Sequence, residues 1–144
     1  MASTNPEKLS CISIILCDDV YRDERTKKLV IVGTFNTINV LQTPAMHPQL
    51  CVLFSLTNGN GDYDLTLAIE HERTGREILS MQGPLRLESP LAIADVDVRL
   101  NGLELPETGK YWVTLRCDGE VVQQRPFTVA MAESTGGEGH AELE

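Results

Sequence analysis

The sequence has no apolar run long enough to cross a lipid bilayer. Its apolar runs are about five to eight residues long, whereas a membrane-spanning helix needs about 20. Aromatic residues are also scarce, at 5% of the chain, and they do not alternate with basic residues as they do in proteins that bind single-stranded nucleic acid. We therefore expect a protein whose partners include neither membrane nor nucleic acid.

The chain also lacks an excess of basic residues. It has 12 Lys and Arg against 21 Asp and Glu, which gives a formal net charge of −9. This sign argues against phosphate backbones or anionic lipid surfaces as main partners. The basic residues of segment 22–28 are interleaved with Asp23 and Glu24. We therefore predict that the whole charged segment, residues 18–28, is a wide, solvated turn or edge.

No Cys-x-x-Cys pair is present among the four cysteines. Each of Cys11, Cys17, Cys51 and Cys117 lies in or beside an apolar run, where a free thiol behaves as a small apolar side chain. The simplest interpretation is a cytoplasmic protein with reduced thiols. The alternative is a disulfide that joins an early strand to Cys117.

Motifs for catalysis and for metal binding are missing as well. No serine has a Gly-x-Ser-x-Gly context, and no glycine-rich loop opens a helix to hold phosphate, so the chain is predicted not to be an enzyme. His71 stands between two glutamates, but on a strand it points away from both. His47 and Cys51 are too few to bind zinc. No cofactor or metal is expected.

Acidic residues before the charged turn offer one candidate surface. Asp18, Asp19, Asp23 and Glu24 could hold calcium, but intervening arginines and the absence of Asp-x-Asp-x-Asp-Gly spacing argue against it. A structural turn and a polar partner surface that includes Asp18 and Asp19 remain the two alternatives.

Short strands separated by turns fill the rest of the chain. Apolar or alternating segments lie at 10–17, 29–41, 50–56, 63–72, 77–82, 85–100, 110–117 and 120–129. Asp118-Gly119 predicts a tight hairpin between the last two. We expect an all-β, immunoglobulin-like antiparallel β-sandwich of seven to nine strands over residues 10–131. A flexible N-terminus (1–9) and a disordered acidic tail (132–144) are expected to flank it.

Two resemblances extend this interpretation. The Pro/Gly-containing segment that leads into Tyr111 resembles the late strands of immunoglobulin-like sandwiches, which implies that the Tyr111 hydroxyl forms a structural tyrosine corner. The segment Cys17-Asp18-Asp19-Val20 and the following Lys-Leu-x-x-x-Gly strand are similar to those of a family of small uncharacterised bacterial proteins. This second resemblance implies a β-sandwich, a bacterial or phage source and no known activity.

The function that these patterns favour is a non-catalytic protein-binding or interaction module, which would use a partner protein or self-association. Trp112 is the predicted anchor, and the C-terminal strand with Pro126 is the predicted edge for pairing. The alternative for Trp112 is packing under a loop. Two other functions remain open: a metal-dependent small-molecule binder or enzyme, and a structural subunit of a larger phage or cell assembly.

Overall fold

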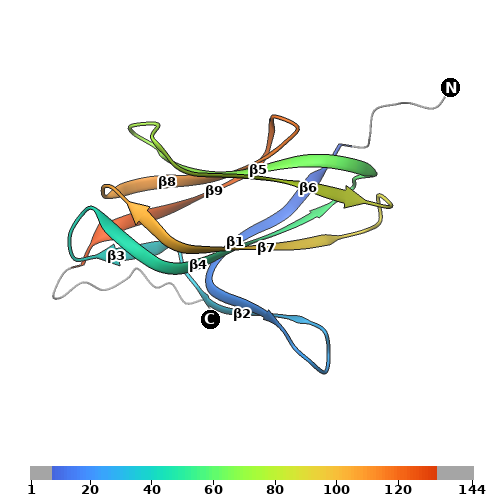
Figure 1. Ribbon diagram of the computed structural model, residues 1–144, viewed down its shortest axis with the longest axis horizontal. Helices are drawn as coiled ribbons and strands as arrows, with labels where there is room; N and C mark the ends of the chain where they lie inside the picture. The colour runs from blue at the N-terminus through green and yellow to red at the C-terminus, as the bar shows by residue number, and fades with distance from the viewer. Residues whose placement is uncertain (1–7, 133–144) are drawn as a thin grey trace, which may run out of the picture.

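The computed structural model describes residues 8–132, which form strands, turns and loops (Figure 1). The strands of this part of the chain are β1 (Ser10–Arg22), β2 (Leu29–Thr34), β3 (Thr37–Val40), β4 (Ala45–Thr57), β5 (Gly61–His71), β6 (Glu77–Leu87), β7 (Ala94–Leu105), β8 (Gly109–Cys117) and β9 (Glu120–Met131). None of the described residues belongs to a helix long and apolar enough to cross a membrane.

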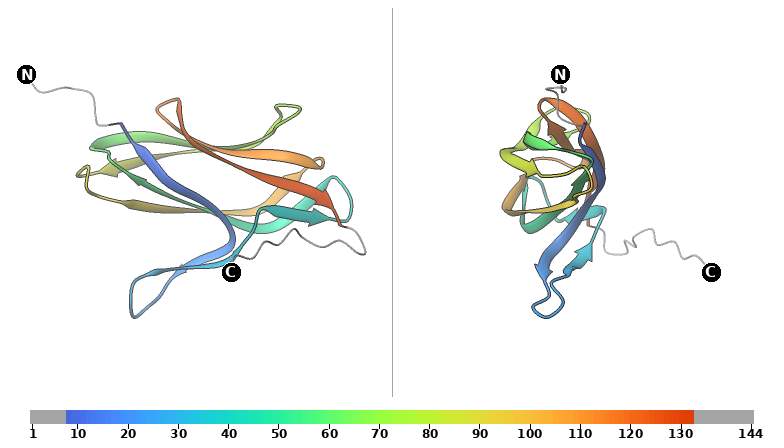
Figure 2. Two further views of the ribbon diagram at one scale, coloured as in Figure 1. Left: turned by 180° about the vertical axis from the view of Figure 1, so that it is seen from behind. Right: turned by 90° about the vertical axis from the view of Figure 1, so that its right-hand side faces the viewer.

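The strands form two sheets that pack face to face (Figures 1 and 2). The first sheet has the order β2-β1-β4-β7, and the second has the order β3-β9-β8-β5-β6. This confirms the predicted all-β sandwich, and its layout is compatible with an immunoglobulin-like fold. One pair departs from the antiparallel prediction, because β3 runs parallel to β9. The chain changes sheet between β2 and β3, where the Asn36 carbonyl accepts the Thr128 N–H.

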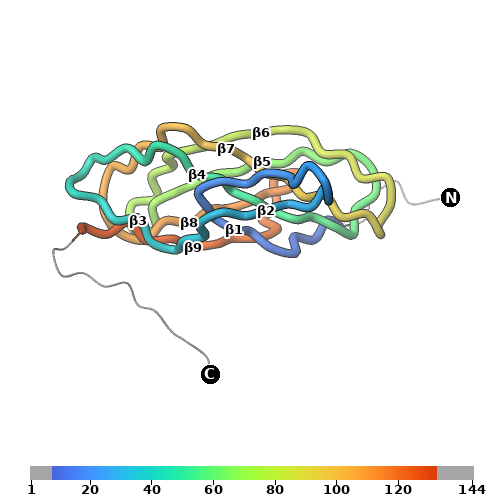
Figure 3. Tube along the Cα trace, turned by 90° about the horizontal axis from the view of Figure 1, so that it is seen from below, coloured from blue at the N-terminus to red at the C-terminus, as the bar shows by residue number. Residues whose placement is uncertain are grey.

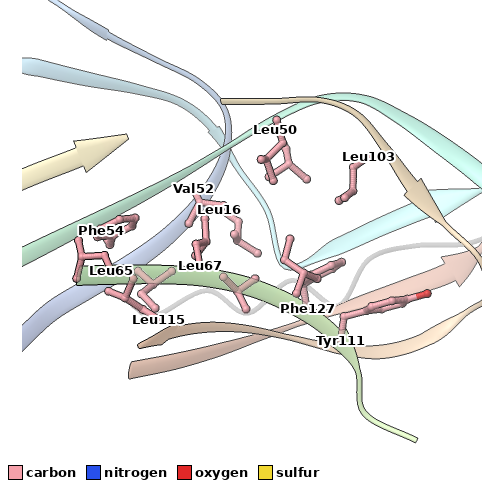
Figure 4. Packing of buried hydrophobic residues seen from close by; sticks show 14 of the residues in the cluster. Leu16, Leu50, Val52, Phe54, Leu65, Leu67, Leu103, Tyr111, Leu115 and Phe127 are labelled. Atoms are coloured by element: carbon pink, nitrogen blue, oxygen red, sulfur yellow. The ribbon is translucent and has the colours of Figure 1, made fainter. Parts of the chain in front are cut away.

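The core lies between the sheets and is built from alternate residues of every long strand. Leu16, Val52, Phe54, Leu67 and Leu115 all point into this layer (Figure 4). Burying each such side chain contributes about 1.5–3 kcal/mol. β4 is buried on both faces in its middle, because Val52 and Phe54 join the core while Cys51 and Leu53 on the other face pack against Cys17 and Val20 of β1.

The predicted wide turn over residues 18–28 is wrong in its extent. β1 continues through the acidic residues to Arg22 and pairs with β2 from Cys17–Thr34 to Arg22–Leu29, so only 23–28 turn. The Asp23 carboxylate accepts the N–H groups of Arg25 and Thr26 at the tip. This β1–β2 hairpin projects from the sandwich (Figures 1 and 2), so both of its faces are partly solvated and show no apolar alternation.

Two proline-containing segments that lie between the predicted strands belong to strands themselves. β6 continues through Gly83 and Pro84, and β4 begins before Pro48. Both places have a neighbouring strand on one side only, because β6 is outermost and β1 pairs with β4 only from Cys51 onward. A proline at such an edge removes no hydrogen bond from the sheet.

The predicted boundaries of the domain change at the N-terminal side. Leu9, placed in the flexible N-terminus by its sequence, is buried in the core. The rest of that segment (1–7) and all but the first residue of the predicted tail (133–144) lie outside the described residues.

Candidate interaction site

The sandwich opens along the side where the outer strands of the two sheets, β6 and β7, face each other (Figures 1 and 3). An apolar groove of about 210 Å³ lies there. Its floor is the core itself, and its walls are Met81, Gly83 and Pro84 of β6 and Val96 and Val98 of β7. We call this the β6–β7 groove. Its lining contains no ionisable side chain.

Exposed apolar side chains lie at the wall of the groove and in the connection between the two strands that border it. Met81, at its wall, is 42% exposed, and the β6–β7 connection holds Leu91 at 91% and Ile93 at 62% exposure. The connection is fixed to β4, because the Thr57 hydroxyl donates to the Ala92 carbonyl at 2.9 Å and the Asn58 N–H donates to the Pro90 carbonyl at 3.2 Å. Leu91 and Ile93 are therefore held in solvent by a tied loop.

Acidic residues surround this side of the molecule. Asp95 and Asp97 alternate with the groove valines on β7, and Asp95 accepts a hydrogen bond from Ser55. Across the groove, Arg86 pairs with two carboxylates, those of Asp62 and Glu88. The rim thus carries more negative than positive charge, which favours a partner with basic groups around an apolar centre.

The two strands that border the groove differ in their free backbone edges. Pro84 lacks an N–H group and interrupts the donors of β6, whereas β7 contains no proline over its whole length. β7 pairs with β4 on one side, and in the described chain no strand pairs with its other side. An extended segment could add to β7 there by main-chain hydrogen bonds.

The sequence does not predict this groove. It depends on which strands are outermost, and the sequence leaves the registers around residues 85–95 ambiguous. The one hint of an interaction surface in the sequence is the pair Leu91 and Ile93. They stand in a Ser/Pro-containing turn, where apolar residues do not contribute to the core.

Trp112, the predicted anchor, lies on the outer face of the second sheet, away from the groove. Its Nε1–H donates to a Glu72 carboxylate oxygen at 3.1 Å, and the Lys110 ammonium lies 4.8 Å from the ring centroid. Cross-strand neighbours are Glu70 and Pro126. The ring is half-buried, between strand neighbours and Glu72, which lies in the turn after β5.

Pro126 lies in a strand that is only partly an edge. β9 is bordered by β8 on one side and by β3 on the other, from Thr128 onward, so the predicted C-terminal edge strand is an inner strand at its end. Pro126 precedes that paired part by two residues, so its nitrogen faces the unpaired side. There Arg125 donates to the Ile14 carbonyl at 2.7 Å and ties β9 to β1.

Tyr111 is fully buried at the end of the core (Figure 4). Its hydroxyl donates to the Glu107 carbonyl at 2.6 Å and accepts the Glu107 N–H at 3.3 Å, which is the geometry of a tyrosine corner. Burial raises the pKa of this phenol. The ring stacks on Phe127 at 5.3 Å and meets His71 edge-on at 4.8 Å. Tyr111 therefore has a structural role.

His71 is buried beside this corner with both ring nitrogens in use. Nδ1 accepts the Thr74 N–H at 3.3 Å, and Nε2 therefore carries the hydrogen that it donates to the Thr108 carbonyl at 2.9 Å. The ring also lies under Gly109, where an added Cβ would come within 2.7 Å of Nε2. No group of three or more metal-ligating side chains occurs among residues 8–132.

Asp18 and Asp19 lie at the base of the β1–β2 hairpin. Asp19 forms a salt bridge with Arg99 at 2.7 Å and accepts the Val20 N–H; these hydrogen bonds lower the pKa of its carboxyl group. Asp18 is exposed, and its carboxylate lies so close to Gly33 that an added Cβ there would meet it at 2.3 Å. The structure separates both residues from Trp112, which is in the other sheet.

Three of the four thiols are buried, and the fourth is partly accessible to solvent. Cys17, Cys51 and Cys117 are buried, and burial raises the pKa of each, that of Cys117 to about 11. Cys11 is only half-buried. We expect a disulfide-exchange reagent at pH 8 to modify Cys11 alone in the folded protein and all four thiols in urea, as counted by mass spectrometry. Modification of Cys17 or Cys51 without urea would contradict the structure.

The chain matches a known protein family. The chain fits the model of a family of unknown function (DUF6941) over residues 12–130, which spans β1 to β9. No curated protein matches the sequence.

Proposed function

We propose that this chain, which belongs to the DUF6941 family of unknown function, is a non-catalytic module that binds an extended segment of a partner protein in the β6–β7 groove. The observation that carries the proposal is the apolar groove itself, whose wall residue Met81 is solvent-exposed; the connection between its two bordering strands exposes two more apolar side chains, Leu91 and Ile93. Exposed apolar surface around a groove is characteristic of interaction sites. The location we propose is a bacterial cytoplasm, which suits an acidic protein with reduced thiols.

The occupant that fits is a strand with apolar residues alternating with basic ones. Successive side chains of a strand point to opposite faces, so one set would enter the groove while the other met Asp95 and Asp97. The free edge of β7 would supply the main-chain hydrogen bonds. A volume of about 210 Å³ accommodates one or two apolar side chains.

The same dimensions give less support to a small-molecule binder or an enzyme. Ligand pockets commonly have volumes of roughly 300–1,000 Å³ and contain a few polar groups that orient the ligand. The β6–β7 groove is smaller, and its one polar side chain is Gln82. Gln82 is already bonded to the carboxylate of Asp64.

The test uses a synthetic heptapeptide in which lysine and valine alternate, labelled for fluorescence anisotropy. We expect saturable binding to the full chain and weakening of at least about tenfold, near 1.4 kcal/mol, in Met81→Lys, because the new ammonium blocks the groove and repels the peptide. In parallel, methyl NMR signals of Val96 and Val98 are expected to shift on binding.

The matched control is Met131→Lys. Met131 is 49% exposed, similar to Met81, but it lies at the end of β9. This variant is expected to bind the lysine–valine peptide as the wild type does, and a peptide with glutamate in place of lysine is expected not to bind. Equal loss in both variants, or shifts confined to residues outside the groove, would overturn the proposal.

A further inference from the structure

The β1–β2 hairpin carries a second exposed apolar surface. It lies at the opposite edge of the first sheet from β7, which borders the β6–β7 groove. Its outer strand has the sequence Leu-Val-Ile-Val, and Ile31 and Val32 are 37% and 43% exposed. On β1, Tyr21 is exposed as well. β2 pairs with β1 alone in residues 8–132, so its other edge is free along a segment of high β-propensity (Figures 2 and 3).

We infer that this edge binds a second copy of the chain, with the two β2 strands antiparallel around a two-fold axis at Ile31. The inference goes beyond the proposed function and uses a different surface. The two four-stranded sheets would then join into one continuous sheet, in which β2 of each copy is an inner strand. A two-fold pairing closes on itself and leaves no further free edge at the interface.

Backbone geometry selects this register. The Asp23 N–H donates to the Lys28 carbonyl, so the polar groups of Lys28 point toward β1. Since these groups alternate along a strand, those of Leu29 and Ile31 point toward the free edge. Centring the axis on Ile31 lets its N–H and C=O bond to Ile31 of the second copy, and it places Leu29 opposite Gly33.

Side chains agree with the same register. Ile31 would lie beside Ile31 of the second copy, and on the other face Val30 would lie beside Val32, twice by symmetry. Cross-strand pairs of β-branched residues stabilise a sheet. The pairing would thus bring the exposed Ile31 and Val32 of the two copies into contact.

Charge at the two ends of β2 favours a second copy over an unrelated strand. The tip segment 22–28 has four basic and two acidic residues in a chain whose net charge is −9. In the antiparallel arrangement, Lys28 of one copy lies opposite Thr34 of the other, and Thr34 is paired with Cys17, next to Asp18. No ion pair of Lys28 or Asp18 is formed within residues 8–132, so each remains available to the other copy.

The experiment is sedimentation velocity on the full chain over a hundredfold range of concentration. We expect the wild type to sediment as a dimer at the upper end, and Ile31→Lys to raise the dimer dissociation constant at least about a hundredfold, because two like charges would then face each other. The matched control is Val121→Lys, on the part of β9 that β8 pairs but β3 does not, which is expected to leave the dimer unchanged.

A second measurement tests the register without disturbing the edge. Ile31→Cys is expected to form a symmetric disulfide-linked dimer with oxidised glutathione as the oxidant: the two introduced thiols together lose two protons and two electrons as glutathione is reduced. Opposed strand residues have Cα atoms about 5.5 Å apart, within disulfide range. A monomeric wild type at every concentration would overturn the inference. A dimer lost in Val121→Lys but kept in Ile31→Lys would assign self-association to β9 instead.

Discussion

Replacing Tyr111 by alanine is expected to lower the free energy of unfolding by about 3–5 kcal/mol, the usual cost of truncating a buried aromatic residue. The ring is fully buried, stacks on Phe127 and meets His71, so its removal leaves a cavity that three strands would have to fill. Urea unfolding followed by Trp112 fluorescence measures the change. A loss below about 1 kcal/mol would contradict the packing described here.

The hydroxyl of Tyr111 can be separated from its ring by Tyr111→Phe. This variant keeps the stacking but leaves the Glu107 carbonyl and N–H without their partner, so we expect a loss of about 1–3 kcal/mol. If phenylalanine were as stable as tyrosine, the corner would contribute no net stability.

Replacing Gly109 by alanine is the second large effect that we expect, about 2–5 kcal/mol in the same urea experiment. Gly109 has a φ of +123°, a conformation that other residues reach only with strain, which costs about 1–3 kcal/mol. The new Cβ would also come within 2.7 Å of the buried His71 ring, and overpacking adds a further cost of about 1–3 kcal/mol.

The matched control for this prediction is Gly75→Ala. Gly75 also has a positive φ, +70°, but no atom lies within 4 Å of the position of its added Cβ. It should lose only the strain contribution, about 1–2 kcal/mol. Equal losses at the two glycines would show that His71 moves aside at no cost.

Local patterns predict the strands well where one face is buried. The alternation at Tyr63, Leu65 and Leu67 and the Asp118-Gly119 turn correspond to β5 and to the β8–β9 hairpin. The hairpin of β1 and β2 is longer than predicted because its charged residues occupy a ribbon exposed on both faces. In such a ribbon, no period of two separates apolar from polar positions.

The candidate site depends on information that no short segment holds. Val96 and Val98 look like ordinary core residues until β7 is known to be outermost and to face β6 across the sandwich. Conversely, the sequence suggests Trp112 as an anchor because large aromatic residues often anchor interfaces. In the structure, its indole N–H bonds to Glu72 and its ring lies beside the Lys110 ammonium, both within the chain. Strand order, more than residue type, decides which apolar groups meet a partner.

The parallel pairing of β3 with β9 joins segments separated by most of the chain. The last strand also borders β8, and through Arg125 it holds the first strand. Contacts between such distant segments require closure of long loops before they stabilise the fold, which slows folding to roughly the millisecond-to-second range for sandwiches of this kind. During synthesis, the sandwich cannot close until β9 has left the ribosome. Until then, the edge of β8 that β9 covers is open to neighbouring nascent chains.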